Sequence, residues 1–283
     1  MRDDFQLFAV TASGPQRLPV PAEAKDLHEL LNARPVGVYT AFRTYEHHLF
    51  LHLDVHLDRL QASMDRLGWP YQLNRAALRL ALHEVCSRYQ QANARVRLDV
   101  LEELDGAPSR ELIALAPFEP VPPRLYRQGV SVAIAPTLHR GDPLVKSADF
   151  VQQRRFYLAQ RHDAYEVLLV NDAGRILEGS SSNFFAMRSG QIFTAGEGIL
   201  HGVARQVVLT VAAERQMPVQ LVAPSVAELS TFDEAALSSS SRAIVPIVRI
   251  DGALVGDGRP GPMVERLLAD YRRYVAAHIA PAV

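Results

Sequence analysis

The proline-rich segment at residues 117–123 most limits how this chain can fold. It reads Pro-Phe-Glu-Pro-Val-Pro-Pro, and four prolines in seven residues favour a stiff, extended connector. The whole chain has 283 residues, enough for one large domain or two ordinary ones. We therefore predict a small N-terminal domain at residues 1–117, a linker at residues 118–126 and a larger domain at residues 127–283.

The spacing of apolar residues predicts helices and strands on both sides of this linker. In the small domain we expect strands at residues 5–10 (an edge strand), 37–45, 49–51, 94–101 and 111–116, and helices at 54–67 and 74–91. Asp54 and Asn74 are the expected helix caps, and a turn at Asp105-Gly106 joins the last two strands. In the large domain we expect strands at 130–135, 166–170, 175–178, 183–187, 191–193, 219–222, 235–237 and 243–250, and helices at 149–162, 202–216 and 262–278. This mixture indicates the α+β class.

Charge and cysteine content narrow the possible partners and location. The formal net charge of -1 argues against nucleic acid or a membrane surface as a partner recruited by bulk charge. The single cysteine, Cys86, excludes a disulfide within the chain and fits a reducing cytoplasm. Residues 1–4 are charged rather than typical of a signal peptide, and no apolar run is long enough to span a bilayer. His47, His48, His52 and His56 resemble a metal cluster but lack any known ligand pattern, so we expect no metal site.

Lys146 is the first candidate for a chemical role. Of the 30 basic residues in the chain, only Lys25 and Lys146 are lysine, so arginine serves almost everywhere a positive charge is needed. Arginine is always protonated, whereas a lysine in a desolvated pocket can lose its proton and attack a carbonyl to form a Schiff base. Both lysines could equally be surface residues left by codon bias, and the count alone does not separate these interpretations.

Three further segments could bind a charged ligand, although each has a simpler explanation. Glu178 ends an expected strand and opens the run Glu-Gly-Ser-Ser-Ser-Asn; it is either a solvated hairpin residue or a buried acid paired with a cationic ring nitrogen. Gly202 opens an expected helix whose unpaired N–H groups could bind a phosphate, yet many helices begin with glycine. The serine run at residues 238–241 offers hydroxyls to the same anion, or is a polar turn.

Arginines in the small domain are weaker candidates. Arg59 lies one turn into a helix, where arginine is usually a surface residue. Arg95 and Arg97 alternate on a strand and so point to one face, which suits a carboxylate but is more often solvated.

Taken in chain order, these segments resemble one known family. Residues 39–43 (Tyr-Thr-Ala-Phe-Arg), 56–60 (His-Leu-Asp-Arg-Leu), Lys146, the Glu178 and Gly202 segments and the serine run are similar to the class IV aminotransferases of pyridoxal-phosphate enzymes, fold type IV. This family includes branched-chain aminotransferases, D-amino acid aminotransferases and aminodeoxychorismate lyases. The resemblance covers roughly residues 37–251, and its specific part runs from Lys146 to Arg205, with a lysine-to-glutamate spacing of 178 − 146 = 32 residues.

The resemblance implies a fold and a role for each candidate. The fold would have a small N-terminal α/β domain and a larger C-terminal, mixed β-barrel-like domain with helices, assembled as a homodimer. Lys146 would hold pyridoxal 5'-phosphate as a Schiff base and then move the substrate Cα proton. Glu178 would pair with the pyridine nitrogen, and Arg59 would hold the phosphate. Further cofactor contacts are implied for Ser182, Asn183, Gly202, Val203, Ala204, Ser240 and Ser241, and substrate contacts for Tyr39, Arg43, Arg97 and Arg242.

Three residues depart from the family pattern. The family often has an acid where this chain has Thr40, and usually a threonine where it has Ala204. Arg242 stands where relatives carry a small residue, so its guanidinium could block the carboxylate site or recruit an acidic substrate. These departures leave the expected cofactor unchanged and bear on the substrate.

We expect an aminotransferase that moves an amino group between an amino acid, branched-chain or similar, and a 2-oxo acid. An arginine-rich pocket would suit 2-oxoglutarate as acceptor. A lyase of the aminodeoxychorismate type is the alternative, but Ser147 follows Lys146 where the lyase pattern has a histidine. A non-catalytic binding protein that kept the fold is a second alternative, and it is disfavoured because both Lys146 and Glu178 are present.

Overall fold

The computed structural model describes residues 4–22, 24, 26, 27, 29–31, 37–104, 106–161 and 163–283. Lys25, Asp105 of the expected turn and His162 at the expected helix end lie outside the described residues. The chain forms two compact units. The first comprises Met1–Glu119, Val145–Val151 and His278–Val283, and the second comprises Pro120–Leu144 and Gln152–Ala277. The Lys146 segment therefore belongs to the first unit.

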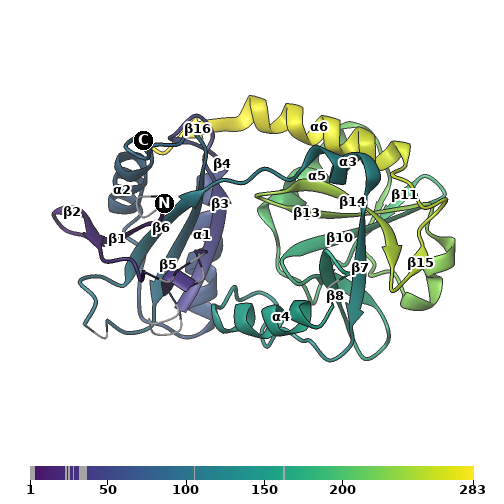
Figure 1. Ribbon diagram of the computed structural model, residues 1–283, viewed down its shortest axis with the longest axis horizontal. Helices are drawn as coiled ribbons and strands as arrows, with labels where there is room; N and C mark the ends of the chain where they lie inside the picture. Colours follow the sequence, from purple (N-terminus) through teal and green to yellow (C-terminus); the bar gives the residue numbers. More distant parts are fainter. Residues whose placement is uncertain are drawn as a thin grey trace. The chain divides into compact units, whose positions relative to one another are not determined.

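The first unit contains a five-stranded antiparallel sheet (Figure 1). Its order is β2-β1-β6-β5-β3, from β2 (Gly14–Leu18), β1 (Gln6–Thr11), β6 (Glu111–Pro117), β5 (Ala94–Leu101) and β3 (Gly37–Arg43). The prediction that the first strand is an edge strand is wrong, because the chain turns back at Gly14, whose φ of 109° suits glycine alone, and β2 covers β1. The polar and proline residues of β2 hide this strand from any apolar pattern.

Two helices cover one face of this sheet. Leu57, Leu60 and Met64 of α1 (Leu53–Arg66) join Leu78 and Leu82 of α2 (Arg75–Ser87) in one buried cluster with side chains of β3, β5 and β6. The other face packs against a short 3-10 helix, Glu29–Leu31. Asn74 caps α2 as predicted, since its side chain accepts a hydrogen bond from the Ala77 N–H. Asp54 is not the cap of α1, which begins after His52.

The Lys146 segment lies along the outer edge of β3. The Tyr39 N–H donates to the Lys146 carbonyl at 2.9 Å, and the Ala148 N–H donates to the Gly37 carbonyl at 2.9 Å. This pairing explains why residues 145–151 belong to the first unit although they are distant in sequence. A second small sheet in this unit pairs β4 (Leu49–Leu51) with β16 (Ile279–Pro281).

The second unit is built on a closed, barrel-like sheet. Its ring of strands consists of β10 (Ser182–Arg188), β13 (Glu234–Ser239), β14 (Ala243–Ile250), β7 (Val130–Ala135), β8 (Glu166–Val170) and β9 (Ile176–Gly179). Pairing of β9 with β10 closes the ring. Three short strands extend it: β11 (Gln191–Phe193), β12 (Val219–Gln220) and β15 (Ala253–Leu254). The mixed class and the barrel-like sheet predicted from the sequence are confirmed.

Helices complete the chain: α3 (Pro123–Gln128), α4 (Asp149–Ala159), α5 (Val203–Glu214), the 3-10 helix η2 (Val226–Thr231) and α6 (Pro262–His278). The prediction of an extended connector is wrong from Pro123 onward. Pro122 is extended and Pro123 takes the first helical position, where its missing N–H costs nothing, so the prolines begin α3 rather than prevent it. Within the described residues, none of the helices has the length and apolar character needed to cross a membrane.

Candidate active site

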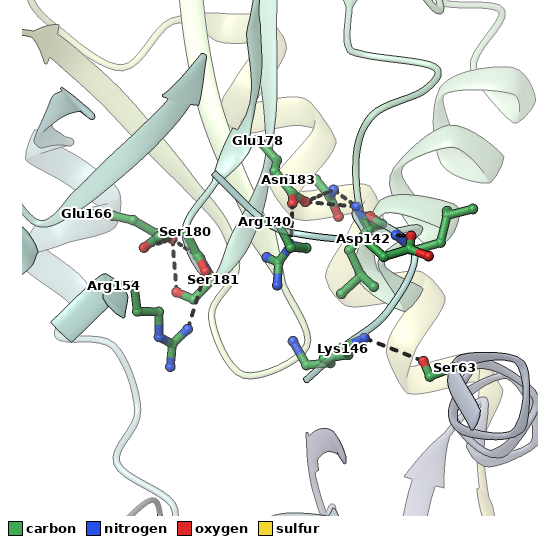
Figure 2. Close-up of polar contacts among 12 residues, drawn as sticks. Ser63, Arg140, Asp142, Lys146, Arg154, Glu166, Glu178, Ser180, Ser181 and Asn183 are labelled. Atoms are coloured by element: carbon green, nitrogen blue, oxygen red, sulfur yellow. Dashed lines mark hydrogen bonds and ion pairs between the residues drawn. The ribbon is translucent and has the colours of Figure 1, made fainter. Parts of the chain in front are cut away.

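Lys146 is fixed through its backbone. Besides its pairing with β3, its N–H donates to Ser63 Oγ at 3.4 Å (Figure 2), and Ser63 Oγ donates to the Arg59 carbonyl at 2.9 Å. The side-chain amine lies 4.8 Å from the centroid of the Tyr39 ring. Ser63 thus connects the predicted catalytic lysine to the turn of α1 that carries the predicted phosphate-binding arginine.

Arg59 is held by Thr40 beneath α1. Its NH2 donates to Thr40 Oγ1 at 2.9 Å, and the same oxygen lies 2.8 Å from His56 Nδ1. Because a guanidinium can only donate, Thr40 Oγ1 accepts from Arg59, and the same hydroxyl shares a second hydrogen bond with His56 Nδ1. Burial, and then the charges of Arg59, Lys146 and His52, hold the pKa of His56 well below its usual range. The His56 ring is therefore neutral in the folded chain, and its Nδ1 is hydrogen-bonded with Thr40.

Tyr39 lies between two cations. The Arg97 guanidinium carbon is 4.1 Å from the ring centroid, and Lys146 Nζ approaches the ring at 4.8 Å. Arg97 is itself paired with Asp99, with Nε to Oδ2 at 2.8 Å and NH2 to Oδ1 at 2.6 Å, and both side chains are buried. Tyr39 and Arg97 are therefore neighbours on adjacent strands.

Arg43, at the end of β3, has a different environment. Its NH2 donates to Asn93 Oδ1 at 2.9 Å, and its guanidinium carbon lies 3.7 Å and 4.4 Å from the ring centroids of Phe118 and Tyr45. These contacts are of the cation–π type and hold the group in place.

Glu178 forms a buried polar cluster in the second unit (Figure 2). Its Oε1 accepts from Arg140 Nε at 3.0 Å, while Oε2 accepts from the Leu200 N–H at 3.1 Å and from Asn183 Nδ2 at 3.3 Å. Asn183 also donates to the Leu200 carbonyl at 2.9 Å. Three donors surround this buried carboxylate, and a negatively charged group at this place is what a protonated ring nitrogen would pair with.

Gly202 is the N-cap of α5. Its φ of −70° is open to any residue, but a Cβ here would lie 2.2 Å from Asn183 Oδ1. Glycine is therefore required by the close approach of Asn183. Since no side chain of the described residues caps α5, the N–H groups of its first turn, at Val203 and Ala204, suit an anion.

Two buried serine hydroxyls lie on the neighbouring strands β10 and β13. Ser182 Oγ and Ser238 Oγ are buried and have no hydrogen-bond partner within the described part of the chain. Ser240 and Ser241 lie in the turn between β13 and β14. The uncapped helix start and the buried acid are joined through Asn183, and together they suit a group that carries both a phosphate and a protonated ring nitrogen.

Arg242 is bound by Glu166. Its NH1 lies 2.7 Å from Glu166 Oε2, NH2 donates to Ser181 Oγ at 2.8 Å, and Nε donates to Ser239 Oγ at 2.9 Å. Glu166 also accepts from Ser181 through its N–H and its hydroxyl (Figure 2). Although burial acts to raise it, Arg242 and Ser181 hold the pKa of Glu166 below its usual range.

Sequence reasoning missed the partners of three arginines, Asp99, Glu166 and Asn93, and it missed Arg140, the partner of Glu178. Glu166 offered a signal, because it is the only charged residue of an otherwise apolar strand, Glu-Val-Leu-Leu-Val. Among the described residues, no group of three or more His, Cys, Asp or Glu is placed to hold a metal ion.

Comparisons with known proteins identify the family. The model of amino-transferase class IV matches residues 37–250. The D-alanine aminotransferase of Bacillus licheniformis is 27% identical over 257 residues, covering 87% of this chain and 90% of the relative. A probable branched-chain-amino-acid aminotransferase of Thermotoga maritima is 29% identical over 244 residues, covering 84% of this chain and 86% of the relative.

A solved structure shows the same fold. The T.th. branched-chain amino acid aminotransferase, complexed with N-(5'-phosphopyridoxyl)-L-glutamate, matches with a TM-score of 0.80 at 20% identity and covers 98% of each chain. The family match spans most of the chain and contains Lys146, Glu178 and Gly202 in order. The chain belongs to the class IV aminotransferase family, whose members use pyridoxal phosphate.

Proposed function

We infer that Lys146 is the catalytic residue of this aminotransferase and that it serves the transfer of an amino group between an amino acid and a 2-oxo acid. The observation that supports this most is the Lys146–Ser63–Arg59 connection. It ties the backbone of a lysine, whose amine can react with a carbonyl, to an arginine suited to a phosphate. A cofactor with an aldehyde and a phosphate needs both groups.

Pyridoxal phosphate supplies the electron sink that makes the Cα–H bond of a bound amino acid acidic. Lys146 Nζ acts as the general base that takes the proton from that Cα, because an unprotonated amine can accept a proton. The resulting ammonium group is then the acid that returns the proton. Glu178 keeps a proton on the ring nitrogen through its negative charge. Arg59 and the first N–H groups of α5 bind the phosphate, and Ser182, Ser240 and Ser241 add hydroxyl or backbone donors.

We propose a donor amino acid with a small or apolar side chain. The reason is that the relatives are named as D-alanine and branched-chain aminotransferases. The homodimeric assembly and the cytoplasmic location expected from the sequence also remain proposals. The lyase alternative is not favoured, because the relatives are named as aminotransferases.

The test is a visible absorption spectrum of the purified protein after addition of pyridoxal phosphate, followed by L- and D-amino acids in separate samples. We expect the absorption of lysine-bound cofactor, and its loss with one hand of the donor. Lys146→Ala should keep the wild-type circular dichroism, because backbone atoms make the contacts with β3, but should lose that absorption and all turnover. Turnover comparable to wild type in Lys146→Ala would refute the assignment.

A further inference from the structure

We propose that Arg205 holds a buried positive charge that the phosphate of the cofactor balances, which makes it a positioning residue for the phosphate at the start of α5. The proposal rests on the proposed function and deepens it, because it gives a role to a residue outside the expected set of cofactor contacts. Arg205 is the third residue of α5, and only 4% of it is exposed. Like Glu178 and Gly202, it belongs to the second unit.

Arg97 and Arg205 are the two arginines that are buried in the described part of the chain, and their surroundings differ. The Arg97 guanidinium pairs with Asp99 through two of its nitrogens. Arg205 pairs with no acid among the described residues: its NH2 donates to the Ala195 carbonyl at 2.8 Å, and its buried Nε has no hydrogen-bond partner there. A buried charge is costly unless it is paired and hydrogen-bonded, so Arg205 calls for an anion from outside the chain.

The charge of Glu178 reaches Arg205, but this acid already has another partner. Burial lowers the pKa of Arg205 and the negative charge of Glu178 opposes that shift, so the two groups are close enough to interact. The ion pair of Glu178 is made with Arg140, whose Nε lies 3.0 Å from Oε1 (Figure 2). One acid shared between two arginines leaves a net positive charge. A phosphate of about −2, together with a protonated ring nitrogen, brings the opposite charge.

The place of Arg205 in α5 also opposes the helix dipole. The start of a helix carries a partial positive charge, so a cation in the first turn is unfavourable unless an anion is bound there. The first turn of α5 has no acidic residue. Helix side chains lean toward the N-terminus, and the hydrogen bond from Arg205 to Ala195, in the segment before α5, follows this direction. Burial and then the charge of Arg205 lower the pKa of His201, so the positive potential extends to the residue before the N-cap.

A bound phosphate relieves these costs together. It supplies a counter-charge to Arg205, accepts from the first N–H groups of α5 and offsets the dipole. Places where a chain breaks several local rules without an internal remedy are commonly functional sites. The charge of Arg205 should therefore weaken the protein without its cofactor and strengthen the binding of phosphate.

A comparison of pyridoxal phosphate with pyridoxal isolates the phosphate, because the two molecules differ only in that group. Arg205→Gln removes the charge but keeps an amide donor for the Ala195 carbonyl, whereas Arg205→Met removes both. We expect each variant to bind pyridoxal phosphate on the order of tenfold more weakly than wild type and to bind pyridoxal as wild type does. Equilibrium titration of the cofactor-free, full-length protein measures both affinities without turnover.

Thermal melting of the cofactor-free protein gives a second readout. Arg205→Met should melt above wild type without ligand, because an unbalanced buried charge is gone, and should gain less stability from inorganic phosphate. Arg97→Met is the matched control: this arginine is equally buried, but its loss leaves the charge of Asp99 unbalanced, so the variant should melt below wild type. Thr194→Val loosens the segment next to Ala195 without a change of charge and should keep the wild-type ratio of the two affinities.

The outcomes separate the two proposals. If the wild-type protein takes up no pyridoxal phosphate, the proposed function itself is refuted. If uptake is normal and the Arg205 variants keep the wild-type preference for pyridoxal phosphate over pyridoxal, only the role of Arg205 is overturned. An equal loss of affinity for both ligands, with a lower melting temperature of the cofactor-free variants, would also overturn it, since Arg205 would then only tie α5 to the Ala195 segment.

Discussion

Arg59 NH2 donates a hydrogen bond to Thr40 Oγ1 at 2.9 Å, at a position where the family often has an acid. An acid would orient Arg59 but would also balance its charge. The threonine hydroxyl, which also lies 2.8 Å from His56 Nδ1, orients the guanidinium without placing a negative charge beside it. The departure at Thr40 therefore suits phosphate binding.

Thr40→Val should separate this orientation from simple burial. Valine keeps the shape but removes the hydrogen bonds that Thr40 makes with Arg59 and His56, a cost of about 1–3 kcal/mol in the free energy of unfolding. Because Arg59 then loses the hydrogen bond that orients its guanidinium, the affinity for pyridoxal phosphate should fall roughly tenfold, or about 1.4 kcal/mol. Urea unfolding and cofactor titration measure the two effects.

Two variants control this experiment. Thr40→Ser retains a hydroxyl and should keep the cofactor affinity. Thr194→Val removes another buried hydroxyl, which donates to the Phe184 carbonyl at 2.8 Å, and should lower stability without changing cofactor affinity. Equal affinity in Thr40→Val and wild type would show that Arg59 does not depend on Thr40.

The neutral state of His56 predicts a pH dependence of stability. The pKa of His56 is lowered in the folded chain by burial, then by Arg59, Lys146 and His52, whereas an unfolded histidine titrates near pH 6.5. Between the lowered folded pKa and about pH 6.5 the unfolded state binds more protons, so stability is full above that value and is lost as the pH falls through this window.

Urea midpoints measured from about pH 7.5 to about pH 5 test this. His56→Asn retains an acceptor near the position of Nδ1, cannot be protonated, and should give a flatter pH profile than wild type. His52→Asn is the comparison variant. The His52 pKa is also lowered, by burial and by His278, but the His52 side chain is less buried than that of His56, so this variant should flatten the profile less. A profile in His56→Asn as steep as in wild type would contradict the assignment.

Gly202→Ala should act through Asn183. The new Cβ would meet Asn183 Oδ1 at 2.2 Å and push the amide away from Glu178 and Leu200. We expect a loss of about 1–3 kcal/mol in stability and weaker cofactor binding, because both the acid and the start of α5 shift. Gly141→Ala, whose Cβ would meet no atom within 4 Å, is the matched control. Identical cofactor affinity in both variants would refute the coupling.

What the sequence could predict depended on how local each signal is. Asn74 and Gly202 mark helix starts because a cap acts within one turn, and both were found. The order of Lys146, Glu178 and Gly202 was sufficient to recognise the family, because each lies in a short segment of its own. Strand β2 was missed, since two of its residues are exposed and it follows its partner through a tight turn.

Contacts between distant segments could not be predicted. Glu166 and Arg242 are 76 residues apart, and only the closed sheet places them 2.7 Å from one another. The sequence therefore suggested two roles for Arg242 at the substrate and did not suggest an internal ion pair. The pairing of Lys146 with β3 is similar, because the strand pattern of residues 37–43 does not show which segment lies at its edge.

Glu178→Gln should separate binding of the cofactor from its use. Glutamine keeps the shape, and its single carbonyl oxygen can accept from Asn183 and the Leu200 N–H, but its NH2 then faces the Arg140 Nε–H. Pyridoxal phosphate should still bind, with stability reduced by on the order of 2 kcal/mol. Without the negative charge, a proton on the ring nitrogen is no longer held, and kcat should fall by on the order of a hundredfold or more, since electrostatic groups at a reacting centre commonly contribute this much.

The control for Glu178→Gln is another buried acid of the same unit. Glu234 accepts from the N–H groups of Met263 and Val264 at the start of α6, at 3.0 Å and 2.7 Å. Glu234→Gln should lower stability to a similar extent and leave kcat close to wild type. Single-turnover spectra with the preferred donor measure the chemical step directly. A wild-type single-turnover rate in Glu178→Gln would mean that the buried carboxylate serves the structure of the barrel and not the chemistry.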